Sequence, residues 1–300
     1  MELYQIRSFV TIAETGQLTR AAEKLHISQP ALSAQLKALE DELELTLFER
    51  TSNGMKLTAA GKQMLDKADK ILSVAQALHN EARALKGEIA GKVSIGTLSD
   101  PEFIRLGEFM STAVARYPLL ELELRQEITG VALEHVRDGD LDASFYYGEL
   151  THPNVARLPL REITYRIAAP AEWRERVKDA GWKEIAEQSW IIPPPISTHH
   201  QLVYTLLREH GVEPTKVVEA DQEDVISSLV KSGVGLALIR DDVALEKASA
   251  GEVCLWEDVR IPTTLWFIHL KERENDPVIR ALLDVLKEIW NLSHDEEAGF

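Results

Sequence analysis

The hydrophobic positions in the first forty-five residues predict three consecutive helices. Residues 3–14 repeat apolar side chains at helical spacing along one face, and Thr15-Gly16 would end that helix. Thr19 is expected to cap a second short helix, and Ser28 to cap a third over residues 29–43. Pro30 falls in the first turn of the third helix, where a missing N–H costs nothing.

The third predicted helix has two chemically different faces. Its buried stripe consists of Leu32, Leu36, Leu39 and Leu43. The opposite face is predicted to offer the short polar side chains Gln29, Ser33, Gln35 and Lys37. A helix that enters the major groove of DNA needs such a face, because bulk would hold the backbone away and phosphate would repel carboxylates. Two interpretations stay open: a plain three-helix packing module, or a DNA-reading helix-turn-helix.

A hairpin is predicted directly after these helices. The runs 47–50 and 55–57 flank Asn53-Gly54, which is a strong turn signal. Arg50 and Lys56 lie at the base of this hairpin, where they are expected to contact phosphates or the minor groove.

Residues 58–86 predict one long helix of about 43 Å at about 1.5 Å per residue, which Gly87 would end. An apolar seam repeats at heptad spacing through Met64, Ala68, Ile71, Ala75, Leu78, Ala82 and Leu85. This seam would pack either on its own domain or against a second chain. We favour packing against a second chain, because the resulting dimer would relate two recognition helices by a two-fold axis.

From residue 92 onward strand-like and helix-like runs alternate, which predicts an α/β fold with a largely parallel sheet. Strands are expected at 92–97, 119–125, 142–147, 163–168, 190–192, 216–219, 235–239, 253–256 and 264–270. Helices are expected at 102–117, 130–138, 172–178, 200–210, 223–232, 242–247 and 277–290. About 205 residues suffice for two small lobes, which would hold a ligand at strand ends beside helix N-termini.

Residues at those places are candidates for ligand binding. They are Thr97, Leu98, Ser99, Asp100, Thr129, Tyr146, Thr198, His199, His200 and Asp221. Hydroxyls and free N–H groups there suit a carboxylate or another small anion. Ser99 and Thr198 could equally be helix caps, and His199-His200 could be surface residues.

Three further patterns limit this prediction. Tyr146 and Tyr147 alternate along a strand, so at most one of them should face a cleft. Asp221 and Glu223 would favour a cationic group on the ligand, or simply cap a helix. Adjacent histidines are not spaced to share a metal ion, so neither a metal nor a cofactor is predicted.

Composition and charge separate the two parts of the chain. Residues 1–92 hold 12 Lys and Arg and 12 Asp and Glu, whereas residues 93–300 hold 21 and 37 and carry the whole excess of −16. The acidic part would stay clear of DNA, and the neutral part could bind it through a few placed cations. The single cysteine, Cys254, excludes an internal disulfide and is expected in the core rather than as a nucleophile. Neither a secretory signal nor a membrane-spanning run is found, which predicts a cytoplasmic protein without membrane contact.

Residues 18–61 closely resemble the DNA-binding region of LysR-type transcriptional regulators. The matching motifs are Ala21-Ala22, Ile27–Ala31, Ser33, Leu36 with Glu40, Leu47-Phe48 with Arg50, and Leu57-Thr58 with Gly61. By this resemblance, Gln29, Pro30 and Ser33 read bases, and Thr19, Arg20, Arg50 and Lys56 position the DNA backbone. Residues 93–300 more loosely resemble the effector-binding domain of the same family, which is similar to periplasmic binding proteins. Those matches lie at Val136–Asp142 and Ser228–Leu238.

The resemblance implies an α-helical winged helix-turn-helix domain with a long linker helix, followed by a two-lobe α/β effector-binding domain. The expected domains are 1–58 for DNA binding, 59–87 for the linker and dimerisation helix, 88–92 for a hinge and 93–300 for effector binding. Within the last, lobe I would comprise 93–163 and 269–300, and lobe II would comprise 164–268.

The expected function is a sequence-specific activator or repressor of transcription, modulated by a small molecule between the lobes. Its expected partners are double-stranded promoter DNA, a small carboxylate effector, RNA polymerase and further copies of the chain in a homodimer or homotetramer. An enzyme is not predicted, because the sequence holds no Gly-rich phosphate loop, G-x-S-x-G or H-E-x-x-H motif. A pure solute-binding protein would leave residues 1–86 unexplained.

Overall fold

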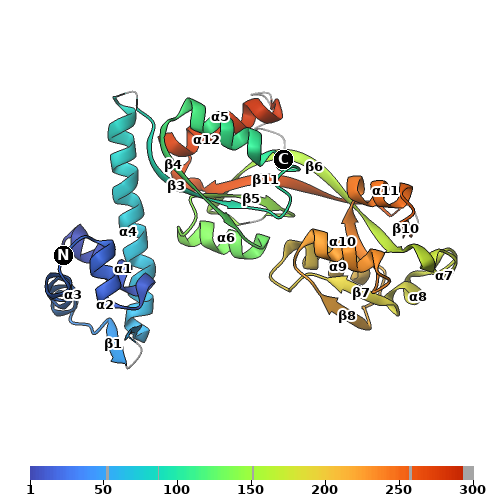
Figure 1. Cartoon of the computed structure of the whole chain (residues 1–300), viewed down its shortest axis with the longest axis horizontal. Coiled ribbons are helices and arrows are strands. Elements are labelled where there is room, and N and C mark those ends of the chain that lie inside the picture. Colours follow the sequence, from blue (N-terminus) through green and yellow to red (C-terminus); the bar gives the residue numbers. More distant parts are fainter. Residues whose placement is uncertain (52–53, 87, 151, 257–258, 293–300) are drawn as a thin grey trace. The chain divides into compact units, whose positions relative to one another are not determined.

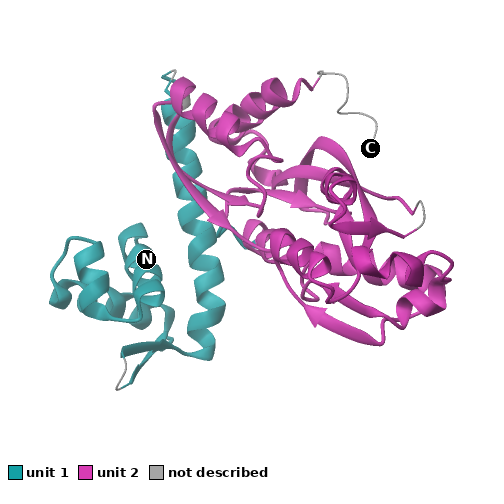
Figure 2. Ribbon diagram, turned by 45° about the vertical axis from the view of Figure 1, so that its right-hand side comes forward, with its two compact units in different colours: residues 1–88, 138–140 teal, residues 89–137, 141–300 magenta. Residues whose placement is uncertain are grey.

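The computed structural model describes residues 1–51, 54–86, 88–150, 152–256 and 259–292. The chain divides into two compact units, residues 1–88 with 138–140 and residues 89–137 with 141–300 (Figure 2). Among the described residues, no helix combines the length and the apolar character needed to cross a membrane.

The first unit consists of three short helices, a hairpin and one long helix (Figure 1). Their bounds are α1 Leu3–Thr15, α2 Leu18–Lys24, α3 Gln29–Leu43, β1 Phe48–Thr51, β2 Gly54–Leu57 and α4 Ala59–Ala84. The predicted stripe of α3 is confirmed, because Leu32, Leu36 and Leu39 are buried against Phe9 of α1 and its neighbours. The prediction that Thr19 caps the second helix is wrong. Gln17 holds the extended backbone of the N-cap, and Thr19 already lies inside α2.

Two polar contacts fix the hairpin to the helices. Oε1 of Glu40 accepts hydrogen bonds from the N–H groups of Leu47 and Phe48, at 2.7 and 3.3 Å. Thr58 caps α4 by accepting from the Gly61 N–H at 2.9 Å. A Cβ on Gly61 would lie 2.1 Å from the Leu47 carbonyl oxygen, so only glycine permits this approach. Residues 52–53 of the predicted turn, and Gly87, lie outside the described residues.

The apolar seam of α4 is divided between two environments. Ala68 is buried in the core of the first unit and Met64 packs against it, and their role as dimer contacts stays a prediction. α1 covers this end of α4 and takes up the first two seam positions. Further along the helix the apolar side chains are exposed: Ile71 by 37%, Val74 by 66%, Leu78 by 71% and the C-cap residue Leu85 by 83%.

The second unit is built on one seven-stranded sheet and one separate strand pair. The main sheet has the order β10-β6-β11-β5-β3-β4, and β9 also pairs with β6. The strand bounds are β3 Ala90–Thr97, β4 Leu119–Gln126, β5 Ala143–Tyr147, β6 Val155–Pro170, β9 Ala237–Arg240, β10 Val253–Leu255 and β11 Ile261–Leu270. The separate pair is β7 Ser189–Ile192 with β8 Lys216–Glu219. Cys254 is buried in β10, as expected of a core residue.

The predicted largely parallel sheet is wrong for the middle of this unit. β3 is parallel to β4 and β5, but β11 is antiparallel to β5 and β6, and β6 is antiparallel to β9 and β10. The predicted hinge at 88–92 is also too long, because β3 pairs with β4 from Ala90 onward.

Helices cover the strands of the second unit. Their bounds are α5 Leu106–Arg116, α6 Thr129–Asp138, α7 Arg174–Val177, α8 Trp182–Ala186, α9 Thr198–Glu209, α10 Glu223–Lys231, α11 Asp241–Ser249 and α12 Pro277–Trp290. The sequence pattern did not predict α8, which is too short to show a helical period.

β6 and β11 lie side by side and connect two lobes, each with its own core (Figure 1). Phe109, Phe145 and Phe267 pack together in the first lobe, with ring centroids 5.2–6.1 Å apart. Trp190 and Trp256 are buried in the second. The predicted lobe boundary at 268/269 is wrong, because residues 265–269 of β11 pair with β5 and belong to the first lobe.

Candidate functional site

The polar residues predicted to face DNA surround a shallow groove between α3 and the hairpin. Thr19, Gln29 and Arg50 line one hollow of the surface. Ser33, Lys37 and again Arg50 line a neighbouring hollow. Arg50 lines both hollows, and we call the surface that they form together the Arg50 groove.

Several cations at this surface are available to a ligand. Arg20, Lys37 and Arg50 are exposed, and within the described part of the chain none of them makes an ion pair. Lys24 differs, because its Nζ lies 2.7 Å from a carboxylate oxygen of Glu14. Unpaired Lys and Arg side chains are what binding to DNA phosphates requires.

The start of α3 presents the residues predicted to read bases. Ser28 caps the helix, since its Oγ accepts a hydrogen bond from the Ala31 N–H at 3.3 Å. Gln29 and Pro30 follow and are exposed, and Ser33 is half-buried one turn later. The cap therefore occupies the Ser28 side chain and leaves that of Gln29 to reach outward.

Two predicted DNA-binding residues point elsewhere. Gln35 accepts a hydrogen bond from the Ser8 hydroxyl at 2.5 Å, because six residues of helix turn it toward α1 and away from Gln29. Lys56 pairs with Glu49 in the hairpin, whereas Arg50 pairs with Met55. Since neighbouring residues of a strand alternate between faces, Lys56 lies on the opposite face from Arg50 and outside the groove.

In the second unit, a cavity of about 290 Å³ lies between the two lobes. It brings together six of the predicted ligand residues: Leu98, Ser99, Thr129, Thr198, His199 and Asp221. Residues that were not in that predicted set complete the wall, chiefly Glu127, Tyr147, Tyr165, Gln222 and Glu223. We call this space the interlobe cavity.

Direct contacts join the lobes beside this cavity. The hydroxyl oxygens of Thr129 and Thr198 are 2.9 Å apart, and the Thr198 N–H donates to Thr129 Oγ1 at 3.1 Å. Arg240 in the second lobe donates to Oδ2 of Asp100 in the first at 2.8 Å. Its guanidinium carbon also lies 3.6 Å from the centre of the Phe103 ring. These contacts hold the two lobes together beside the cavity.

Gly130→Ala is expected to destabilise the contact between the lobes. A Cβ at this position would lie 1.9 Å from the carbonyl oxygen of Ile196, so the start of α6 and the segment that holds Ile196 must move apart. Overpacking of this kind costs about 1–3 kcal/mol, which urea unfolding followed by tryptophan fluorescence would measure. Gly107→Ala is the matched control, because nothing lies within 4 Å of its Cβ. Equal stability of the two variants would show that α6 and the segment around Ile196 do not meet in solution.

The predicted tyrosine is the wrong one of its pair. Tyr146 is buried within the first lobe beside Trp266, and Tyr147 lines the interlobe cavity. Strand alternation predicts that only one of the two faces the cavity. Which one depends on the pairing of β5 with β11, which aligns Tyr147 with Leu265.

Three further predicted residues have other contacts. Thr97 is buried, with its hydroxyl 3.5 Å from the Arg125 carbonyl oxygen. Asp100 accepts from Arg240 and also from the Phe103 N–H at 2.9 Å, so it caps a turn. His200 stacks on Tyr204 at 4.3 Å and faces away from His199, as expected for adjacent residues of a helix. None of the three lines the interlobe cavity.

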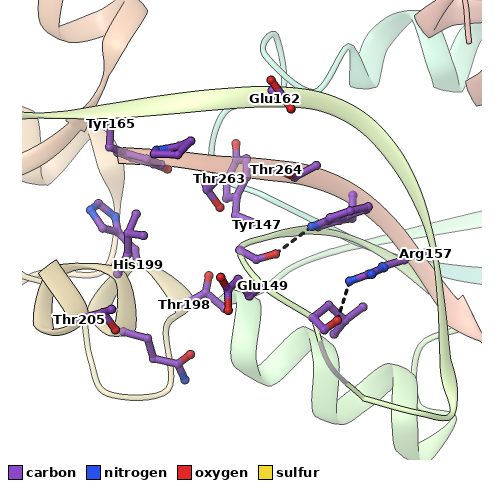
Figure 3. Close-up of a pocket in the computed structure, with 16 residues that line it drawn as sticks. Tyr147, Glu149, Arg157, Glu162, Tyr165, Thr198, His199, Thr205, Thr263 and Thr264 are labelled. Carbon is purple, nitrogen blue, oxygen red and sulfur yellow. Dashed lines mark hydrogen bonds between the residues drawn. The ribbon is translucent and has the colours of Figure 1, made fainter. Parts of the chain in front are cut away.

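A second cavity, of about 580 Å³, adjoins the first (Figure 3). The two share Tyr147, Tyr165, Thr198 and His199, so these side chains stand between them. Its one arginine, Arg157, donates to the Leu150 carbonyl oxygen at 2.6 Å and lies over the Trp266 ring. Only two of the predicted ligand residues, Thr198 and His199, reach this second cavity.

The interlobe cavity is acidic. Glu127, Asp221 and Glu223 line it, and no lysine or arginine is among its lining residues. Burial lowers the pKa of His199 to about 4, so its imidazole is neutral at pH 7. Among the described residues, no three His, Cys, Asp or Glu side chains gather as a metal site.

The reason given for a carboxylate ligand, free N–H groups at the start of α9, is wrong for the first two of them. The Thr198 N–H donates to Thr129, and the His199 N–H donates to the capping hydroxyl of Ser197 at 3.2 Å. Both are therefore occupied before any ligand binds.

The neutral state of His199 predicts a dependence of stability on pH. Unfolding exposes an imidazole with a pKa near 6.5, which takes up a proton more readily than the folded one. This contribution to stability is therefore present above about pH 6.5 and is lost as the pH falls toward 4. Between pH 7.5 and pH 5, His199→Gln should lose about 1–2 kcal/mol less unfolding free energy than the wild type. The exposed His79→Gln serves as the control, and identical losses in both variants would contradict a buried neutral His199.

Comparisons with known proteins agree with both units. Residues 3–62 match the family model described as a bacterial regulatory helix-turn-helix protein of the lysR family, and residues 86–291 match the LysR substrate binding domain. The chain is 28% identical over 311 residues to the HTH-type transcriptional regulator BenM of Acinetobacter baylyi, with 97% of this chain and 96% of BenM covered.

Solved structures share the fold. Full-length OxyR from Pseudomonas aeruginosa superposes with a TM-score of 0.71 at 23% identity, covering 96% of this chain and 95% of OxyR. CbnR complexed with its target DNA superposes with a TM-score of 0.61 at 21% identity, covering 96% of this chain and 99% of CbnR. The predicted fold class, a helix-turn-helix domain followed by a two-lobe α/β domain, is confirmed.

Proposed function

The chain belongs to the LysR family of bacterial transcriptional regulators, and we propose that it reads DNA through the Arg50 groove and senses a small molecule in the interlobe cavity. As in that family, it is a DNA-binding regulator with an effector-binding domain. Because regulators of this kind act on DNA without chemistry of their own, we propose no catalytic activity. We propose that it acts in the cytoplasm, where bacterial DNA lies.

The observation that carries the DNA-binding proposal is the Arg50 groove itself. Gln29 is exposed at the start of a capped helix, Arg50 lies beside it, and Lys37 follows on the same side. In the proposed complex, Gln29 and Ser33 contact base edges and Pro30 packs at the groove floor. Thr19, Arg20, Lys37 and Arg50 bind phosphates. Ser28 shapes the helix start, and Gln35 and Lys56 are left out of the interface.

The exposed part of α4 supports a dimer. An exposed apolar stripe runs along this part of the helix, formed by the side chains of Ile71, Val74, Leu78 and Leu85. Ala75 and Ala82 lie on the same stripe. We propose that two chains pair along this stripe, so that two copies of α3 read two half-sites of one operator. Pairs of such dimers would give the tetramer that the family resemblance suggests.

The effector proposal rests on the position of the cavity between two lobes. A ligand there touches Ser99 and Thr129 on one lobe and Thr198 and Asp221 on the other. It therefore has a different affinity for each arrangement of the lobes, and by linkage it changes how the chain holds DNA. We propose that this change alters contact with RNA polymerase at the promoter.

Fluorescence anisotropy with labelled DNA from upstream of the protein's own gene tests the proposal. We expect tight binding to that fragment, weaker binding to a scrambled fragment of equal length, and lower affinity as salt is raised. Promoter fragments from neighbouring genes extend the test if the first fragment is not the operator. Equal, weak binding to every fragment would contradict sequence-specific recognition.

A further inference from the structure

The charge of the interlobe cavity constrains the chemistry of its ligand. Three carboxylates line the cavity, and the one histidine among its lining residues, His199, is neutral. Glu127 lies against His135 of the same lobe, with its Oε2 2.6 Å from Nδ1, and the two form an ion pair when His135 is protonated. Asp221 and Glu223 are the carboxylates that remain for a ligand.

Glu223 is only partly compensated by the protein. Its Oε2 is 3.4 Å from Nη1 of Arg240, and its Oε1 is buried without a hydrogen-bond partner among the described residues. Arg240 makes shorter contacts to two other carboxylates, Asp242 at 2.6 Å and Asp100 at 2.8 Å. One guanidinium is thus shared among three carboxylates. Burial raises the pKa of Glu223, Arg240 opposes this rise only in part, and the neighbours Asp100 and Asp242 raise the pKa further.

Asp221 adds a second carboxylate. It is exposed at the mouth of the cavity, and no ion pair or hydrogen bond of its side chain is found in the described part of the chain. A buried acceptor without a donor costs about 1–3 kcal/mol, and more when it is charged. A ligand that supplies an N–H donor to the buried Oε1 of Glu223 recovers this cost.

Other lining residues of the cavity carry hydroxyl groups. Thr129 Oγ1 accepts the Thr198 N–H, and one hydrogen bond joins the two threonine hydroxyls. Two hydroxyl hydrogens are present and that bond uses one, so the other is free to donate to a ligand oxygen. Ser99 provides a further hydroxyl on the first lobe.

We propose that the effector carries a cationic amine or guanidinium group that binds Asp221 and Glu223, and an oxygen that binds the hydroxyls of Thr129, Thr198 and Ser99. This inference rests on the proposed function of the interlobe cavity as the effector site. A volume of about 290 Å³ lies near the lower end of ligand pockets, so the ligand has the size of an amino acid rather than of a nucleotide. A ligand whose only charge is a carboxylate would meet the carboxyl groups of Asp221 and Glu223 and no unshared cation.

Thermal unfolding of the full-length wild type against matched compounds tests the proposal. The panel contains the twenty protein amino acids, their decarboxylated amines and their deaminated acids; lysine, 1,5-diaminopentane and hexanoate are one such set. At millimolar concentration, at least one amine-bearing compound should raise the melting temperature by several degrees, and its deaminated acid should not. Stabilisation by acids that lack an amine, or by no amine-bearing compound, would overturn the proposal.

Two variants then locate the cationic group. Asp221→Asn, at an exposed position, and Glu223→Gln should each weaken binding of the stabilising compound by roughly 10- to 100-fold in calorimetric titration. Asp224→Asn is the matched control, since Asp224 is an exposed carboxylate next in the chain that does not line the cavity. Unchanged affinity in Asp221→Asn and Glu223→Gln would overturn the assignment. These measurements need no DNA, so they fail independently of the DNA-binding proposal, which anisotropy tests separately.

Discussion

The double substitution Leu78→Glu and Leu85→Glu in α4 is expected to separate the dimer and to lower the affinity for operator DNA by roughly 100-fold or more. These two side chains are the most exposed of the apolar stripe, at 71% and 83%, so the substitution disturbs no core of the single chain. Four carboxylates would face one another across a two-fold axis, where apolar surface is otherwise buried. A monomer then binds one half-site and lacks the additional affinity that binding to the second half-site provides.

Analytical ultracentrifugation at micromolar concentration would follow the change in mass, with anisotropy on the same samples. Leu245→Glu is the matched control, because Leu245 is 43% exposed on α11 and lies outside the stripe. We expect a monomer for the double variant and the wild-type mass for the control. A double variant that keeps its mass and its operator affinity would rule out this stripe as the dimer interface.

Gln29→Ala is expected to weaken operator binding by about 1–3 kcal/mol, which is about 5- to 150-fold, and to relax the preference at one base pair. Gln29 is exposed at the first position of α3, and its amide can pair with an adenine edge in the major groove. Removing it leaves the helix cap of Ser28 and the cation of Arg50 in place, so non-specific binding should persist.

Competition anisotropy against operators with single base-pair changes would measure this effect. Gln63→Ala, at an exposed position of α4, controls for the loss of an amide elsewhere. If Gln29→Ala and the wild type discriminated equally among the operators, the first turn of α3 would not contact base pairs in the major groove of the DNA.

Features with a local cause were predictable from the sequence. The Ser28 cap, the leucine stripe of α3 and the Asn53-Gly54 signal between β1 and β2 act within a few residues, and each predicted element is present. Strand runs were also found near their true positions, because buried strands show their own hydrophobic pattern.

Features that depend on pairing between distant segments were not predictable. Alternation shows that Tyr146 and Tyr147 face opposite ways, but only the register with β11 decides which of them meets the cavity. Gln35 has the same chemistry as Gln29, and only the position of Ser8 on α1 shows that it is used within the fold.

The acidity of the cavity was partly visible in the sequence and partly not. Asp221 and Glu223 lie beside the start of α10 and were weighed as a cation site. Glu127 follows β4, and its place in the same wall emerges only when the lobes come together. The occupied N–H groups at α9 likewise arise from Thr129, a residue 69 positions away.

The central claim is that a paired, effector-responsive regulator reads two half-sites of one operator. The most direct test is footprinting on fragments that the full-length protein selects from sheared genomic DNA of its source. The account predicts two protected segments whose centres are separated by whole helical turns, on the same face of the duplex. It also predicts that Leu78→Glu with Leu85→Glu abolishes the paired pattern. Uniform protection of any fragment, or a single isolated segment that the double variant protects equally well, would contradict it.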